Sequence, residues 1–97
     1  MEKVYAEKLE FVEALDQAVA KIPYVEAVEY KHIPGRGSEF VKFTWDSGDY
    51  MYIDVTCDSL SAILSEISAA ISGGSPVGRI RSMRHSSLID EWWEEAE

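Results

Sequence analysis

The side chains that most often catalyse reactions or bind metals are few and far apart in this chain. His32, Cys57 and His85 belong to no C-x-x-C or H-x-x-x-H pattern, so their spacing does not predict a metal site. A nucleophilic cysteine needs a neighbouring base that helps to form the thiolate. Cys57 is instead followed by Asp58, whose negative charge disfavours a thiolate. We therefore expect a buried structural thiol, no metal, no cofactor and no catalytic residue, and we predict that the protein is not an enzyme.

Carboxylates form two groups along the chain. The first group is Asp46, Asp49, Asp54 and Asp58, and no basic residue lies among them. The second group is the tail, with Asp90, Glu91, Glu94, Glu95 and Glu97. Such rows can present negative charge as phosphates do along nucleic acid, and so neutralise the basic groove of a partner protein. The structural alternative is a turn at Asp46 and Asp49, a helix cap at Asp58 and a solvated acidic tail.

Trp92 and Trp93 lie within the tail carboxylates, and each can bury on the order of 150–250 Å². In a helix, Leu88 lies under Trp92 and Ile89 under Trp93. Either at least one tryptophan docks on the rest of the protein, or both anchor a partner. The candidate receiving surface is the outer face of the predicted sheet, with Phe40, Tyr50 and Tyr52. The predicted partner-binding residues are Asp46, Asp49, Asp54, Asp90, Glu91, Trp92, Trp93, Glu94 and Glu95.

One basic stretch separates the two acidic groups. Arg79, Arg81 and Arg84 are a possible basic contact for phosphate or RNA. They could equally pair with the nearby carboxylates, which would add little stability if the pairs are exposed.

Composition limits the class of protein. The chain has 97 residues, 46% of them hydrophobic, which is enough for one domain with a modest core and argues against a disordered or membrane protein. Charges interrupt the N-terminal apolar residues, so we expect no signal peptide. A single cysteine favours a reducing cytoplasm. The net charge of −9 argues against general nucleic-acid binding and favours either a basic partner or a role in solubility alone.

The hydrophobic periodicity predicts the elements that must position these residues. Helical spacing is found over residues 3–22, 59–72 and 88–96, and strand alternation over 25–33, 39–45 and 50–56. Asp58 is the expected N-cap of the second helix, and Ser87 with Asp90 a capping box for the third. The predicted fold is α+β: helix, three-stranded antiparallel meander, helix, then a short acidic C-terminal helix. We expect an α-β-β-β-α domain over residues 1–74, then a linker (75–86) and the acidic helix within residues 75–97.

This order of elements, together with the acidic tail, resembles small acidic phage-encoded anti-CRISPR proteins. The hairpin 43–50 (FTWDSGDY) and its continuation 55–60 (VTCDSL) also look like short phage open reading frames. The resemblance implies a non-enzymatic inhibitor in the cytoplasm of a bacterial host cell, which occupies the DNA- or guide-binding surface of a CRISPR effector complex. Arg79, Arg81 and Arg84 depart from a pure nucleic-acid mimic.

We therefore expect an inhibitory binding protein that docks an acidic and aromatic surface on a basic nucleic-acid-handling effector. The alternative is a small structural or assembly domain that acts as a homodimer. A third hypothesis is direct RNA or DNA binding through the three arginines.

Overall fold

The computed structural model of this chain describes residues 3–73, 82–84 and 87–96. Its helices and strands follow one another as α1 (Lys3–Val19), β1 (Val25–Ile33), β2 (Ser38–Trp45), β3 (Tyr50–Asp54), α2 (Leu60–Gly73), β4 (Ser82–Arg84) and α3 (Ser87–Glu95). The sheet order is β1-β2-β3-β4, and each neighbouring pair is antiparallel. The predicted α+β fold, with its three-stranded meander and three helices, is confirmed.

The fourth strand was not predicted. Residues 75–86 read as a linker, but 82–84 pair with β3 in the register Met51↔Arg84, Tyr52↔Met83 and Ile53↔Ser82. Without this partner the backbone N–H and C=O groups along one side of β3 would be an open sheet edge. Three residues are too few to show the alternation by which strands are recognised in a sequence.

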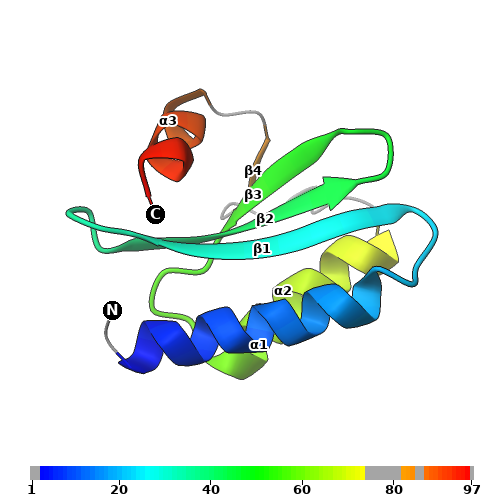
Figure 1. The fold of residues 1–97 in the computed structure, drawn as a ribbon, viewed down its shortest axis with the longest axis horizontal. Coiled ribbons are helices and arrows are strands. Elements are labelled where there is room, and N and C mark those ends of the chain that lie inside the picture. The colour runs from blue at the N-terminus through cyan, green and yellow to red at the C-terminus, as the bar shows by residue number, and fades with distance from the viewer. Residues whose placement is uncertain (1–2, 74–81, 85–86, 97) are drawn as a thin grey trace.

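The elements form three layers (Figure 1). α1 and α2 lie side by side on one face of the sheet, and α3 lies on the other. Alternation explains the arrangement, since successive strand side chains point to opposite faces. Val41 and Phe43 belong to the cluster under the two long helices, whereas Phe40 belongs to the cluster under α3.

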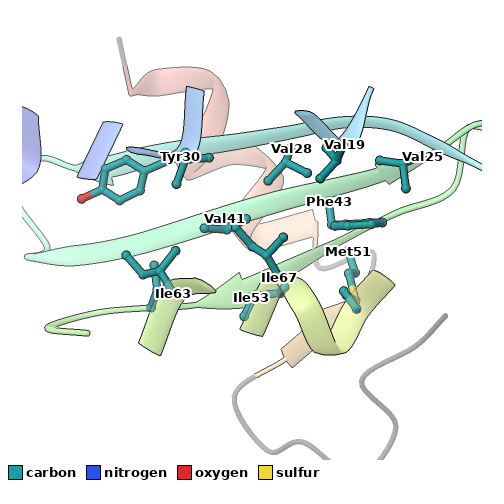
Figure 2. Close-up of a cluster of buried hydrophobic side chains, with 13 residues drawn as sticks. Val19, Val25, Val28, Tyr30, Val41, Phe43, Met51, Ile53, Ile63 and Ile67 are labelled. Carbon is teal, nitrogen blue, oxygen red and sulfur yellow. The ribbon is translucent and has the colours of Figure 1, made fainter. Parts of the chain in front are cut away.

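The inner cluster, between the sheet and the two long helices, is mainly aliphatic and also contains the buried side chains of Tyr30, Phe43 and Met51. Figure 2 shows Val41, Phe43 and Ile53 from the sheet close to Ile63 and Ile67 from α2. Val12 and Val19 of α1 belong to the same cluster. A register irregularity between Val25 and Ala27 shifts the alternation of β1, so that Val25 and Val28 both belong to this cluster.

The ends of the long helices differ from the sequence prediction. α1 ends at Val19 rather than at residue 22, and the Ile22 amide donates to the Val19 carbonyl in a tighter turn before Pro23. α2 is capped by Ser59, whose Oγ accepts from the Ala62 amide at 3.2 Å. Asp58, the expected cap, therefore does not hold this position.

Two polar residues have environments that the sequence analysis did not anticipate. Cys57, predicted to be a buried structural thiol, is exposed and has a φ of 63°, a backbone conformation that is uncommon outside glycine. Glu66, the single charged residue of α2, is buried. The periodicity of apolar residues does not report the burial of either side chain. Cys57 lies between β3 and α2, and Glu66 is a polar residue within α2.

The outer cluster holds α3 against the sheet. Ile89, Trp93 and Ala96 recur at helical spacing and pack with Ile33, Phe40 and Tyr52. Leu88 is exposed and Trp92 is only partly buried. The pairing of Ile89 with Trp93 is therefore the docked face of the helix, and the expectation that at least one tryptophan docks on the outer sheet face is confirmed.

The two adjacent tryptophans provide an internal comparison of stability. We expect Trp93→Ala to lower the free energy of unfolding by about 3–5 kcal/mol, because it removes a large side chain that is 4% exposed from the outer cluster. Trp92→Ala should cost clearly less, since part of this ring already faces solvent. Urea unfolding followed by far-ultraviolet circular dichroism measures both values. Equal losses would contradict this account of α3 docking.

Candidate functional site

The predicted acidic and aromatic surface of α3 is partly used inside the protein. The Asp90 carboxylate accepts hydrogen bonds from the hydroxyls of Tyr50, at 3.0 Å, and Tyr52. Asp90 thus ties α3 to β3. The capping box with Ser87 stays a prediction, because the Ser87 side chain lies outside the described ones. The hydrogen bond to Asp90 and burial raise the pKa of Tyr50, and burial together with the same carboxylate raises that of Tyr52.

Trp93 is also an internal residue rather than an exposed anchor. Its backbone carbonyl accepts from Lys31 Nζ at 2.9 Å, and the same ammonium lies 4.9 Å from the centre of the indole ring. Trp92 remains partly exposed, and the Arg36 guanidinium lies 4.1 Å from its ring centre. Of the predicted α3 residues, Glu91, Glu94 and Glu95 are fully available to a partner, and Trp92 is available in part.

The first acidic group is divided in the same way. Asp46 and Asp49 are exposed in the β2–β3 turn, where the Asp49 amide donates to Ser47 Oγ at 3.3 Å. Asp54 is partly buried, and its Oδ1 accepts from the Thr56 amide at 2.9 Å. The turn and α3 lie well apart in Figure 1. Asp54 pairs with Phe40, whose side chain packs under α3, so the first acidic group is divided between the turn and the far end of β3.

The basic stretch lies largely outside the described residues. Arg79 and Arg81 fall in the range 74–81, about which the structure gives no description. Arg84 belongs to β4, where its backbone pairs with Met51. Whether the three arginines pair internally or contact a partner stays a prediction.

The exposed charge is nevertheless strongly one-sided over the described residues. The exposed carboxylates are Glu7, Glu10, Glu13, Glu26, Glu29, Asp46, Asp49, Glu91, Glu94 and Glu95. The exposed cations with described side chains are Lys3, Lys21 and Arg36. Lys42 is partly buried, with its ammonium 4.5 Å from the centre of the Tyr50 ring. Among the described side chains, exposed carboxylates therefore clearly outnumber exposed cations.

A buried polar network on the helix side of the sheet was not recognised as a site. Lys8 Nζ donates to Glu39 Oε1 at 2.7 Å, and the Tyr30 hydroxyl donates to the same oxygen at 2.7 Å. Glu39 Oε2 accepts from the Cys57 amide at 2.9 Å. One signal was present in the sequence, because Lys8 interrupts the apolar stripe of α1 and such a lysine needs a partner when buried.

The charge state of Glu39 follows from these contacts. Burial by itself would raise the pKa of this carboxyl. Hydrogen bonds from Lys8, from the Cys57 amide and from Tyr30, together with the Lys8 charge, outweigh burial and hold the pKa below its ordinary value. Burial and the neighbouring carboxylate raise the pKa of Tyr30, which therefore stays a hydrogen-bond donor.

The network lies beside a surface cavity of about 370 Å³ between the start of α1 and the loop that leads into α2. Its lining residues are Val4, Tyr5, Glu7, Lys8, Glu39, Cys57, Asp58, Ser59 and Leu60. The Tyr5 ring stacks on His32, with ring centres 3.8 Å apart, which fixes one wall. The Glu39 hydrogen bond to Cys57 fixes the opposite wall. These contacts therefore hold Tyr5 and Glu39 in place on the cavity lining.

Comparison with known proteins does not add to these observations. The chain matches no protein-family model, no curated protein and no solved structure. None of the described helices combines the length and apolar character needed to cross a bilayer. In the part of the chain that the structure describes, no group of three His, Cys, Asp or Glu side chains could hold a metal ion. Functional proposals must therefore rest on the surfaces described above.

The buried ion pair makes a testable contribution to stability. Glu39→Gln should lower the free energy of unfolding by about 3–5 kcal/mol at neutral pH, because it leaves the buried Lys8 charge without its counter-ion. Since the native pKa of Glu39 lies below its ordinary value of 4.5, the carboxylate stabilises the fold fully above that pH. The cost of Glu39→Gln should therefore shrink as the pH falls below about 4.5.

Urea unfolding of wild type and Glu39→Gln across a pH series measures this effect. Glu29→Gln, the same substitution at an exposed position of β1, is the control and should change stability by about 0.5 kcal/mol or less. A cost of Glu39→Gln that is constant down to the acid limit of folding would show that its carboxylate is not the charged partner of Lys8.

Proposed function

We propose that this protein is a non-enzymatic inhibitor that docks its acidic surface on a basic, nucleic-acid-handling partner. One observation carries the proposal: exposed carboxylates greatly outnumber exposed cations among the described side chains. An excess of one sign attracts a surface of the opposite sign over distances of about 10 Å at moderate salt. A basic groove that normally holds nucleic acid is the protein surface with the strongest opposite charge.

The internal use of the cations supports the same proposal. Lys8 is neutralised by Glu39, and Lys31 and Lys42 lie against aromatic rings of the outer cluster. The exposed carboxylates of α3 and of the β2–β3 turn would then meet an opposing basic surface.

The finer proposal is that the partner is a CRISPR effector complex and that the protein is phage-encoded and acts in the bacterial cytoplasm. Such an effector holds its guide–target duplex in a positively charged channel, which reads the backbone rather than the base sequence. Carboxylates at Asp46, Asp49, Glu91, Glu94 and Glu95 would occupy positions that phosphates otherwise take. Trp92, partly exposed at the same helix, would supply apolar contact at this interface.

A charge-reversal experiment tests the proposal. Binding of the full chain to purified RNA-guided effector complexes should weaken steeply from low salt to roughly 0.5 M NaCl. Glu91→Lys with Glu94→Lys should weaken it about tenfold or more at low salt, and should restore DNA cleavage by the effector. Interferometry and a cleavage assay measure the two effects.

The matched control is Glu13→Lys with Glu26→Lys, which changes the net charge equally at exposed positions of α1, on the other face of the sheet, and at the start of β1. If both double variants weaken binding by the same factor, net charge rather than the α3 surface is responsible. Binding that is insensitive to both salt and the α3 substitutions would refute the electrostatic docking.

A further inference from the structure

We infer that the groove between α1 and α2 receives an apolar side chain from a basic segment of the partner protein. This inference rests on the proposed function, because it takes the partner to be basic, and it identifies a second contact surface. It concerns the side of the sheet opposite α3 and uses none of the residues that the sequence analysis assigned to partner binding.

The floor of the groove is apolar and open to solvent. Val4 and Leu60 line the cavity described above, and they are 46% and 40% exposed. Leu60 also lines an adjoining hollow with Glu7, Glu10 and Phe11. Leu64, 42% exposed, lies one turn further along the same face of α2. These side chains form an apolar strip on a surface that is otherwise rich in charge.

The core does not require this strip. The buried apolar side chains of α2 are Ile63, Ile67 and Ala70, which belong to the inner cluster against the sheet. Leu60 and Leu64 follow a neighbouring line of the helix, where serines such as Ser61 and Ser65 are also exposed. An exposed apolar strip bordered by polar residues is the usual character of an interaction site.

The charge of the residues around the groove indicates the sign of the charge that the partner segment should carry. Glu7 and Glu10 of α1 border the apolar floor, and Asp58 lies in the cavity lining. The one cation among these lining residues, Lys8, is buried and already paired with Glu39. The lining as a whole is therefore acidic, and an apolar side chain flanked by lysine or arginine has the complementary chemistry.

The shape of the cavity favours insertion of a side chain. A volume of about 370 Å³ is close to the lower limit for ligand pockets, which begin at about 300 Å³. The Tyr5–His32 stack and the Glu39–Cys57 hydrogen bond fix its walls. Because the receiving surface is preorganised, little conformational entropy is lost there on binding.

The test uses the full chain and three synthetic peptides. The first peptide alternates pairs of lysine and leucine, the second replaces leucine by serine, and the third replaces lysine by glutamate. Fluorescence anisotropy gives the affinities, and amide chemical shifts in the ¹⁵N-labelled protein locate the bound peptide. We expect the lysine–leucine peptide to bind about tenfold or more tightly than either control peptide, with the largest shifts at Val4, Glu7, Leu60 and Leu64.

Matched substitutions then separate the groove from general charge. Leu60→Asp should weaken binding of the lysine–leucine peptide about tenfold or more, whereas Leu88→Asp, at an exposed leucine of α3, should change it by about twofold or less. Glu7→Lys with Glu10→Lys should weaken binding more than Glu26→Lys with Glu29→Lys. Because both leucines are exposed, we expect each variant to fold, and circular dichroism is the check.

Equal effects of Leu60→Asp and Leu88→Asp on peptide binding would overturn the inference. Equal binding of the glutamate–leucine peptide, chemical-shift changes confined to α3, or no peptide binding at all would overturn it as well. A doubled mass in light scattering that Leu64→Asp abolishes would identify a second copy of this chain as the occupant instead. If the groove variants leave binding to the effector complex intact while the α3 variants abolish it, the groove is refuted and the proposed function stands. If no effector complex binds at low salt, the proposed function itself is refuted.

Discussion

The buried contact between Lys8 and Glu39 connects α1, β1, β2 and the segment that leads from β3 into α2. Lys8 comes from α1, Tyr30 from β1 and Glu39 from β2, and the second carboxylate oxygen of Glu39 holds the Cys57 amide. The Glu39 backbone takes part as well, since its amide donates to Thr56 Oγ1 and its carbonyl accepts from the Val55 amide. A buried charge is tolerated only when it is fully paired, so these elements must meet in one geometry. That geometry sets the start of α2 and with it one wall of the groove.

The central strand β2 makes the two faces of the sheet depend on one register. Glu39, Val41 and Phe43 point to the long helices, and Phe40 points to α3. A shift of one residue would exchange the faces, placing Glu39 under the aromatic rings and Phe40 beside Lys8. The same alternation places Lys31 and Lys42 against the rings of the outer cluster. The register of β2 therefore decides both which side chains form the two clusters and where these two lysines lie.

Sequence periodicity predicted the order of the elements because the long helices and the first three strands each bury one regular face. It failed where a single contact between distant segments decides the outcome. Asp90 has the spacing of a capping residue, and no local pattern shows that its carboxylate also accepts hydrogen bonds from Tyr50 and Tyr52. Trp93 has the same sequence context as Trp92, and only its packing on the outer sheet face makes it an internal residue. The short strand β4, the exposure of Cys57 and the groove beside Leu60 depend in the same way on tertiary contacts, for which local patterns carry no signal.

The docking of α3 also has a consequence for how the chain reaches this fold. The bonds that hold the helix join residues far apart in sequence, such as Lys31 with Trp93 and Tyr50 with Asp90. Contacts of long sequence separation form slowly, because loop-closure entropy must be lost before they are made. During synthesis α3 leaves the ribosome after the whole meander, so Phe40 and Tyr52 face water until the helix arrives. We expect this interval to be the stage at which the chain is most prone to aggregate.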